Sequence, residues 1–321
     1  MTYFADRRGV SLTIRAALFA IVALTAVQLD GAARDSAAPA PPNLKAATSQ
    51  AFDRYVKLTE ARNDLELESG RPFFWVDDLP AAERAESEAA LKRGEVKVRK
   101  LETRDHGERI DCPGGIIHHW AGVIFVPGAK LDAVLGVLED YDHHAAYYAP
   151  DVERSKVESR DGDHLRVFLR FRRHKVITVV LNTEHDVRYF RDSQTRAHSR
   201  STATRIAEVE NAGKSDEREK TPGEDQGFLW RMETWWRMEE RDAGVYVQSE
   251  VVSLTRDIPT GLHWLIGPFV TGIPKESLTF TLESTRRAAQ RHSPKQNARR
   301  YGVCPGSRSL FEPTGARPVF F

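Results

Sequence analysis

The sequence predicts an α+β protein in which a curved antiparallel sheet of about six to seven strands grips one long C-terminal helix. Three observations lead to this class. Strand-like segments follow one another without an intervening helix between residues 152 and 256. A hairpin signal, Asp161-Gly162-Asp163, separates the first two of them. A helical segment follows the last strand. Consecutive strands joined by short turns pair antiparallel, and one helix can then cover a face of the sheet.

Composition excludes several classes of protein. The chain has 321 residues, of which 40% are hydrophobic and 29% charged, enough for one large core and an accessory segment. The 47 Lys and Arg nearly balance the 46 Asp and Glu, which argues against a nucleic-acid binder. The 2 cysteines exclude a four-thiolate zinc site. Since no His-Glu-x-x-His spacing occurs either, we expect no metal and no cofactor.

The N-terminal residues 1–33 have the features of a cleavable export signal. Arginines at positions 7, 8 and 15 precede an apolar run at 16–27. This run is shorter than the roughly 20 residues of a membrane-spanning helix. Gly31 and Ala33 are small enough for a cleavage site. We therefore expect an exported protein, periplasmic or secreted, and an uncleaved N-terminal membrane anchor is the alternative.

Residues 34–110 precede the main strand region. A Pro/Ala-rich linker at 34–45 cannot build a core. An N-terminal helical extension follows at 46–110. It contains a helix from about 48 to 67, a second from about 78 to 93 that starts with a proline in its first turn, and an edge strand near 95–104.

The main domain is expected at 111–292, followed by a poorly ordered tail at 293–321 that is rich in Arg, Pro, Ser and Gly. Its first strand is rich in β-branched residues, and the next segment has apolar residues at helical spacing. The later strands alternate apolar and polar residues. The expected elements are a strand at 116–126, a helix at 130–148, strands at 152–160, 165–172, 176–190, 196–209, 228–240 and 245–256, and a helix at 275–290.

This order of elements resembles the START-like (helix-grip, SRPBCC) superfamily, of the polyketide cyclase/dehydrase and lipid-transport type. The segment Val123-Ile-Phe-Val-Pro127 before a helix, and Ile258-Pro259 with Trp264 before the last helix, carry the resemblance. It covers about residues 114 to 292. It implies an apolar tunnel between the sheet and the C-terminal helix, which would hold an apolar or amphipathic small molecule.

The side chains expected to line this tunnel come from the inward positions of the strands and from the segment before the last helix. Aromatic and methionine side chains suit an adaptable apolar site. The alternative is a solid core packed against the helix. The expected ligand-binding residues are Leu169, Phe171, Val179, Leu181, Phe228, Trp230, Met232, Trp236, Met238, Val247, Ser249, Val251, Trp264 and Phe269.

Three polar residues are candidates for the same tunnel: His119, His185 and Thr234. Either histidine could serve as a general acid or base if the protein were an enzyme. Hydrogen-bonded core histidines are the alternative. The basic run Arg170-Phe-Arg-Arg-His-Lys175 suggests transient contact with a membrane surface or an anionic lipid headgroup, with a solvated turn as the alternative.

The two cysteines lie on either side of the main domain. In an oxidising compartment, Cys112 and Cys304 could form a disulfide that closes a long loop. Two free thiols are the alternative.

From the sequence we therefore expect an exported, non-catalytic binding or carrier protein for a lipid, an isoprenoid or a polyketide-like molecule. An envelope interaction module with a filled core, and a cyclase- or dehydratase-like enzyme that uses the same cavity, are the alternatives.

Overall fold

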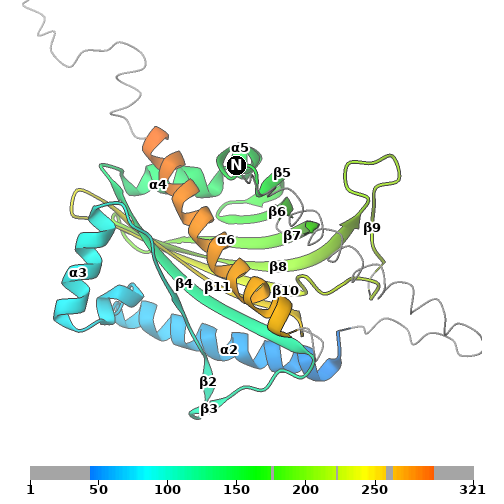
Figure 1. Ribbon diagram of the computed structural model, residues 1–321. Helices are drawn as coiled ribbons and strands as arrows, with labels where there is room; N and C mark the ends of the chain where they lie inside the picture. The colour runs from blue at the N-terminus through cyan, green and yellow to red at the C-terminus, as the bar shows by residue number, and fades with distance from the viewer. Residues whose placement is uncertain (1–43, 175–176, 222, 258–262, 293–321) are drawn as a thin grey trace, which may run out of the picture. The chain divides into compact units, whose positions relative to one another are not determined.

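The computed structural model describes residues 44–174, 177–221, 223–257 and 263–292, with the backbone alone for 263–271 (Figure 1). The predicted signal, most of the linker and the tail lie outside these residues. All described residues belong to one compact unit that starts at Asn43. The helical extension and the strand region are thus parts of one unit.

The described residues form a nine-stranded antiparallel sheet in the order β1-β4-β11-β10-β8-β7-β6-β5, with β9 beside β8. The sheet is open, and the helix-grip α+β class expected from the sequence is confirmed. β1 is the edge strand expected near 95–104, and the small strand β9 adds to the strands that the sequence predicts. The sheet consists of β1 (Lys97–Lys100), β4 (Gly115–Pro127), β5 (Val152–Asp161), β6 (His164–His174), β7 (Thr178–Arg191), β8 (Arg196–Glu210), β9 (Arg218–Glu219), β10 (Arg231–Arg241) and β11 (Gly244–Arg256).

Helices lie on both sides of the sheet (Figure 1). We call the face that meets α4 and α6 the inner face, and the face that meets α2 the outer face. A separate hairpin joins β2 (Arg104–Asp105) and β3 (Glu108–Arg109). The helices are α2 (Ala46–Ser69), η1 (Trp75–Asp78), α3 (Ala81–Lys92), α4 (Leu131–Glu139), η2 (Tyr141–His143), α5 (His144–Tyr147) and α6 (His263–His292).

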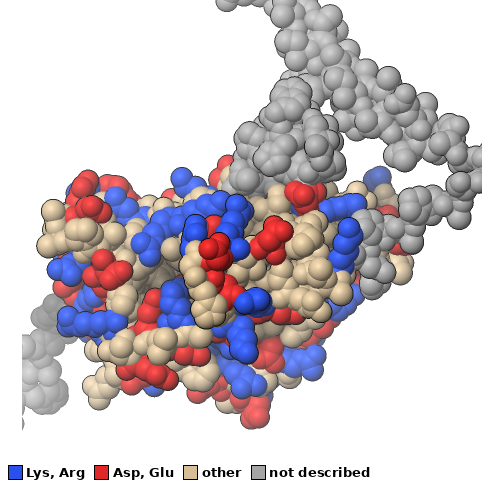
Figure 2. Space-filling view, turned by 90° about the horizontal axis from the view of Figure 1, so that it is seen from below, with Lys and Arg blue, Asp and Glu red and all other residues tan. Residues whose placement is uncertain are grey.

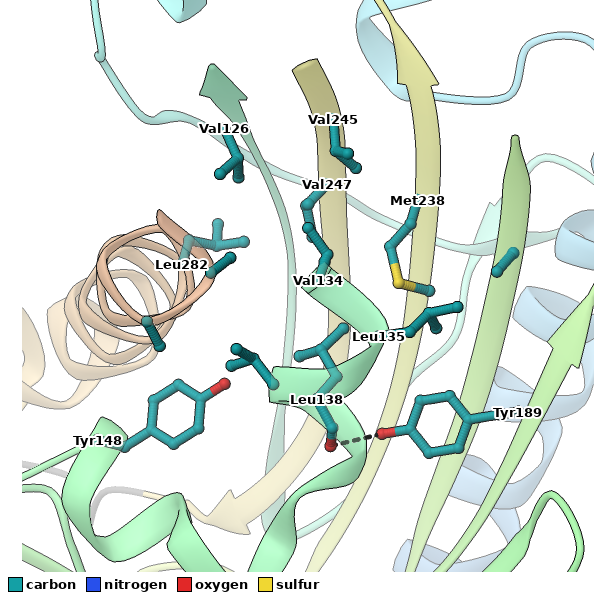
Figure 3. Close-up of a cluster of buried hydrophobic side chains, with 14 of the residues drawn as sticks. Val126, Val134, Leu135, Leu138, Tyr148, Tyr189, Met238, Val245, Val247 and Leu282 are labelled. Carbon is teal, nitrogen blue, oxygen red and sulfur yellow. Dashed lines mark hydrogen bonds between the residues drawn. The ribbon is translucent and has the colours of Figure 1, made fainter. Parts of the chain in front are cut away.

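One end of the inner face is a close-packed apolar core (Figure 3). Val126, Val245 and Met238 are fully buried there against α4 and α6. Leu135 and Leu138 of α4 and Leu282 of α6 belong to the same cluster, which is therefore a solid core.

Gly122 of β4 determines how closely α6 approaches the sheet. A Cβ at this position would lie 2.5 Å from Leu282 Cδ1 and 3.3 Å from Leu278 Cδ2. Both leucines are buried, so neither can move away freely. We expect Gly122→Ala to lower the free energy of unfolding by about 1–3 kcal/mol in urea denaturation, because the methyl group overpacks this contact.

Gly136→Ala in α4 is the matched control. Nothing lies within 4 Å of its Cβ position, and alanine is favoured over glycine inside a helix. This variant should be neutral or stabilising. If Gly122→Ala were as stable as the unmodified protein, the close approach of α6 would be wrong.

Two helices differ from the sequence expectation. The helix expected at 130–148 breaks at Asp140, which has a non-helical backbone (φ −84°, ψ 59°). Its carboxylate accepts hydrogen bonds from His143 Nδ1 (2.7 Å) and the Tyr147 hydroxyl (2.6 Å), and such local bonds compete with a helix. The last helix starts at His263, earlier than expected, so Trp264 and Phe269 lie within it. Glycine and proline lower helix propensity, but a helix anchored by tertiary packing can tolerate them.

Candidate functional site

Buried hydroxyl groups replace the apolar core over the other end of the inner face. Ser199, Thr234 and Ser249 are 1%, 8% and 1% exposed. They lie on neighbouring strands, since Trp236 pairs with Ser249 of β11 on one side and with Ser199 of β8 on the other. The hydroxyl of Ser199 is buried without a hydrogen-bond partner. A buried hydroxyl in this state is uncommon and invites a partner from outside the chain.

His185 of β7 lies on the same face and is 4% exposed. Its Nε2 lies 2.9 Å from Thr183 Oγ1, which donates its own proton to the carbonyl of Leu169. Nε2–H is therefore the donor and Nδ1 the acceptor, and the Ser201 hydroxyl lies 3.4 Å from Nδ1. Burial lowers the pKa of His185 to about 4. The ring is neutral at pH 7, and a hydroxyl rather than a carboxylate orients it.

Large apolar side chains beside these hydroxyls remain only half-buried, although they border the packed core. Each of these side chains packs partly buried against the core. They are Trp120, Phe171, Trp236 and Val251 of the sheet and Phe280 of α6. Met232 is half-buried as well. The inner face thus combines accessible aromatic surface with buried hydroxyls, a composition typical of sites for amphipathic molecules.

The predicted ligand-binding residues separate into three sets. Met238 and Val247 are fully buried in the solid core, so the alternative of a packed stripe holds for these two. Trp264 and Phe269 have side chains outside the described residues. Leu169 is a buried member of the core cluster at its border. The half-buried or hydroxyl-bearing end of the inner face and its continuation on β7 and the end of β6 contain Phe171, Val179, Leu181, Met232, Thr234, Trp236, Ser249 and Val251.

Phe228 and Trp230 are corrections. The sequence places both on the inward stripe, but β10 starts only at Arg231. Phe228 is 41% exposed. Trp230 packs in the outer-face cluster with α2, and its Nε1–H donates to Asp225 (2.7 Å). Gly227, directly before Phe228, has a positive φ of 77° and is not part of a strand. Strand alternation therefore does not extend to Phe228 and Trp230.

His119 is also a correction, because it lies on the outer face rather than at a tunnel wall. It is 2% exposed. Its Nε2 lies 2.8 Å from Glu250 Oε1 and its Nδ1 lies 2.9 Å from the Tyr55 hydroxyl of α2. Since an ionised carboxylate only accepts, Nε2–H is the donor. Nδ1 of the neutral ring accepts from the Tyr55 hydroxyl, whose oxygen in turn accepts the backbone N–H of Thr103 (2.7 Å).

This histidine belongs to a buried charge network that fastens α2 to the sheet. Arg62 of α2 binds both Glu66 and Glu250. Burial lowers the pKa of His119, which outweighs the effect of Glu250. Burial would raise the pKa of Glu250, but the hydrogen bond from His119 and the charge of Arg62 hold it below its usual range. His119 is therefore neutral and Glu250 ionised at pH 7.

Arg237 of β10 extends the network at 2% exposure. Its guanidinium donates to the carbonyl of Phe73 (3.0 Å) and binds Glu66 (2.7 Å) and Asn63. Seen from the side where α2 lies in Figure 1, basic and acidic side chains are interleaved on the surface (Figure 2). The network is an anchor for the helical extension, which therefore covers the outer face.

The remaining candidates contribute little to the inner face. Arg170 is 4% exposed and forms ion pairs with Glu153 and Glu217. Arg172 and Arg173 also bind carboxylates, and residues 170–174 belong to strand β6, so this part of the run is an ion-paired strand end rather than a solvated turn. Cys112 is half-buried, with Sγ 3.9 Å from the carbonyl of Thr48. Cys304 lies outside the described residues, so the disulfide stays a prediction.

Two pockets are bounded by described residues beside α4, away from the predicted ligand residues. One encloses about 290 Å³ between α4 and the ends of β7 and β8, and the other about 400 Å³ near Tyr141 and Arg160. In the part of the chain that the structure covers, no group of three or more His, Cys, Asp or Glu could hold a metal ion. No helix within those ranges is long and apolar enough to cross a membrane.

Sequence reasoning missed several residues of the inner face. Thr183, Ser199, Ser201 and Trp120 belong to it but were not among the candidates. The strict alternation of small residues at 197, 199, 201 and 203 was the available signal. No signal pointed to the network of Arg62, because its members come from distant segments.

No family model matches the chain, and no curated protein matches it. Solved structures do match at the level of the fold. A STAR-related lipid transfer protein from Xanthomonas axonopodis is 17% identical, with 60% of this chain and 98% of that chain covered and a TM-score of 0.39. The ZhuI aromatase/cyclase from Streptomyces sp. R1128 is 15% identical, with coverages of 55% and 95% and a TM-score of 0.34.

The lipid transfer domain of human StarD13 is 9% identical, with coverages of 66% and 98% and a TM-score of 0.36. These are likenesses of fold alone. The helix-grip arrangement of this chain is given by its own strand order, its open antiparallel sheet and the helix across the inner face.

Proposed function

We propose that this protein is an exported, non-catalytic binding or carrier protein for an apolar or amphipathic small molecule, such as a lipid, an isoprenoid or a polyketide-like compound. The molecule is held between the hydroxyl-bearing end of the inner face and α6. The observation that carries this proposal is the contrast between the two ends of that face. One end is a packed core, and the other keeps half-buried tryptophan, phenylalanine and methionine side chains next to buried hydroxyls.

Burial of ligand carbon against these side chains supplies most of the affinity, at about 25 cal/mol per Å² before the costs of association. Trp236 is the centre of the site, because it lies between Ser199 and Ser249 and is only half-buried. Export rests on the sequence of residues 1–33. Contact with a membrane surface stays a prediction.

Native mass spectrometry of the full chain, purified from the envelope of its own cells, tests the proposal. We expect a stoichiometric adduct whose extract is an apolar or amphipathic molecule. The double variant Trp236→Ala and Met232→Ala should lose most of the adduct, because it removes two half-buried side chains of the site. The same spectrum shows whether residues 1–33 have been removed.

Phe228→Ala is the control, since this residue is exposed and precedes β10, and its loss should leave the adduct unchanged. An adduct-free chain would contradict the carrier and favour the envelope interaction module. A bound molecule released in chemically altered form would favour the cyclase- or dehydratase-like enzyme. For that enzyme His185 is the candidate acid or base, since His119 lies on the other face.

A further inference from the structure

We infer that the buried polar group of the bound molecule is uncharged: a hydroxyl, a ketone or an ester carbonyl, rather than a carboxylate, a phosphate or an ammonium group. This inference rests on the proposed function, because it specifies the chemistry of the same site. It follows from the residues of the inner face and from the partners of the charged side chains beside it.

Over the stretches given at the end of this paragraph, the inward positions of the five central strands contain no Asp, Glu, Lys or Arg. Farther along β8 and β10, the inward Glu208 and Glu240 are each paired with a lysine. A ligand group against these strand positions therefore meets hydroxyls, imidazoles and apolar side chains. The inward positions are every second residue of 118–126 in β4, 183–189 in β7, 197–203 in β8, 232–238 in β10 and 245–253 in β11.

Charged residues toward the ends of β6 and β8 already have partners. Glu208 accepts from Lys220 Nζ (3.0 Å) and from the backbone N–H groups of Gln226 and Phe228. Arg173 binds Asp151 and lies 3.6 Å from a carboxylate oxygen of Glu276. Neither side chain offers an unused charge to a ligand.

The histidines of this face do not supply a charge at pH 7. Burial lowers the pKa of His118 to about 4, helped by the charge of Lys100, and burial lowers that of His185 to about 4. An anion or a cation placed here would lose its hydration without gaining an opposite charge, which is strongly unfavourable. A neutral group loses far less.

Ser199 supplies the matching hydrogen-bond group. Its hydroxyl is buried and unpartnered, and its cross-strand neighbour Trp236 is half-buried. A hydroxyl both donates and accepts, so it can bind an alcohol or a carbonyl. Binding of such a group gives the buried Ser199 hydroxyl a hydrogen-bond partner and so removes the free-energy cost of leaving it unsatisfied. A charged group could make the same hydrogen bond, but the free-energy cost of its own desolvation would cancel the gain.

Competition against the neutral dye N-phenyl-1-naphthylamine tests this, with 1-decanol and decanoate as probes of equal chain length. At pH 8 we expect decanol to displace the dye from the full chain at a concentration at least ten times lower than decanoate. Ser199→Ala should weaken decanol about five-fold and leave decanoate unchanged. Ser199→Lys should reverse the preference, because it supplies the missing cation. Ser87→Ala, a buried serine of α3, is the control and should change neither.

If decanoate bound as well as decanol, or if Ser199→Ala left both affinities unchanged in a folded protein, the inference would be overturned. Failure of the dye to bind at all would contradict the proposed function itself. The two failures are therefore distinguishable in one experiment.

Discussion

The folded protein should lose stability steeply as the pH falls from 7 toward 5. His118, His144 and His185 are 4%, 6% and 4% exposed, and burial lowers the pKa of each to about 4. In the unfolded chain the same rings titrate near 6.5. Below that value the unfolded state binds more protons, so each ring stabilises the fold at neutral pH and loses this contribution as the pH falls toward 4.

The expected loss is about 2 kcal/mol for each histidine at pH 5, relative to pH 7.5. Three such losses are comparable to the whole stability of a typical domain, about 5–15 kcal/mol. Urea midpoints followed by tryptophan fluorescence at pH 7.5, 6.5, 5.5 and 5 measure the slope. The variant His144→Gln should lose about a third less stability over this range than the unmodified protein.

His106→Gln is the control for the pH experiment. Its side chain is 96% exposed, so this variant should have the same slope as the unmodified protein. A stability that stays flat between pH 7.5 and 5 would show that the three rings are not held neutral by burial.

Glu250→Ala should destabilise the protein by about 3–5 kcal/mol, the second large effect. Glu250 is 1% exposed and accepts from His119 of β4 and Arg62 of α2. Its removal leaves a buried imidazole N–H unpaired and takes away one of the two carboxylates that bind Arg62, and loss of one member of a buried ion pair is usually costly. Urea denaturation at pH 7.5 measures this change.

The exposed pair of Arg93 and Glu95 is the matched comparison. These side chains are 62% and 51% exposed, so Glu95→Ala should cost under about 1 kcal/mol. Similar losses for Glu250→Ala and Glu95→Ala would contradict the role of the network in anchoring α2.

The elements themselves could be predicted where local signals agree. The strands at 152–160, 196–209 and 245–256 alternate clearly and are confirmed. The helix from about 48 to 67 is confirmed as Ala46–Ser69. The break at Asp140 depends on the side chains of His143 and Tyr147. Local propensity does not contain such contacts, so that helix was predicted too long.

The candidate site could be predicted only in part. Alternation correctly grouped Met232, Thr234 and Trp236 on one face. It could not tell which face of β4 meets α6, because both faces are buried and apolar. His119 was therefore assigned to the wrong side. A period of two groups residues by face, but it does not say what covers each face.

By itself the sequence determined the α+β class, the succession of strands along the chain and the terminal helix, because these follow from local periodicity and turn residues. Only the tertiary structure decided that α2 covers the outer face through Arg62, Glu250 and Arg237. It also decided which end of the inner face is solid core and which keeps half-buried aromatic side chains. Those properties come from contacts between segments far apart in the chain, and no local pattern specifies them.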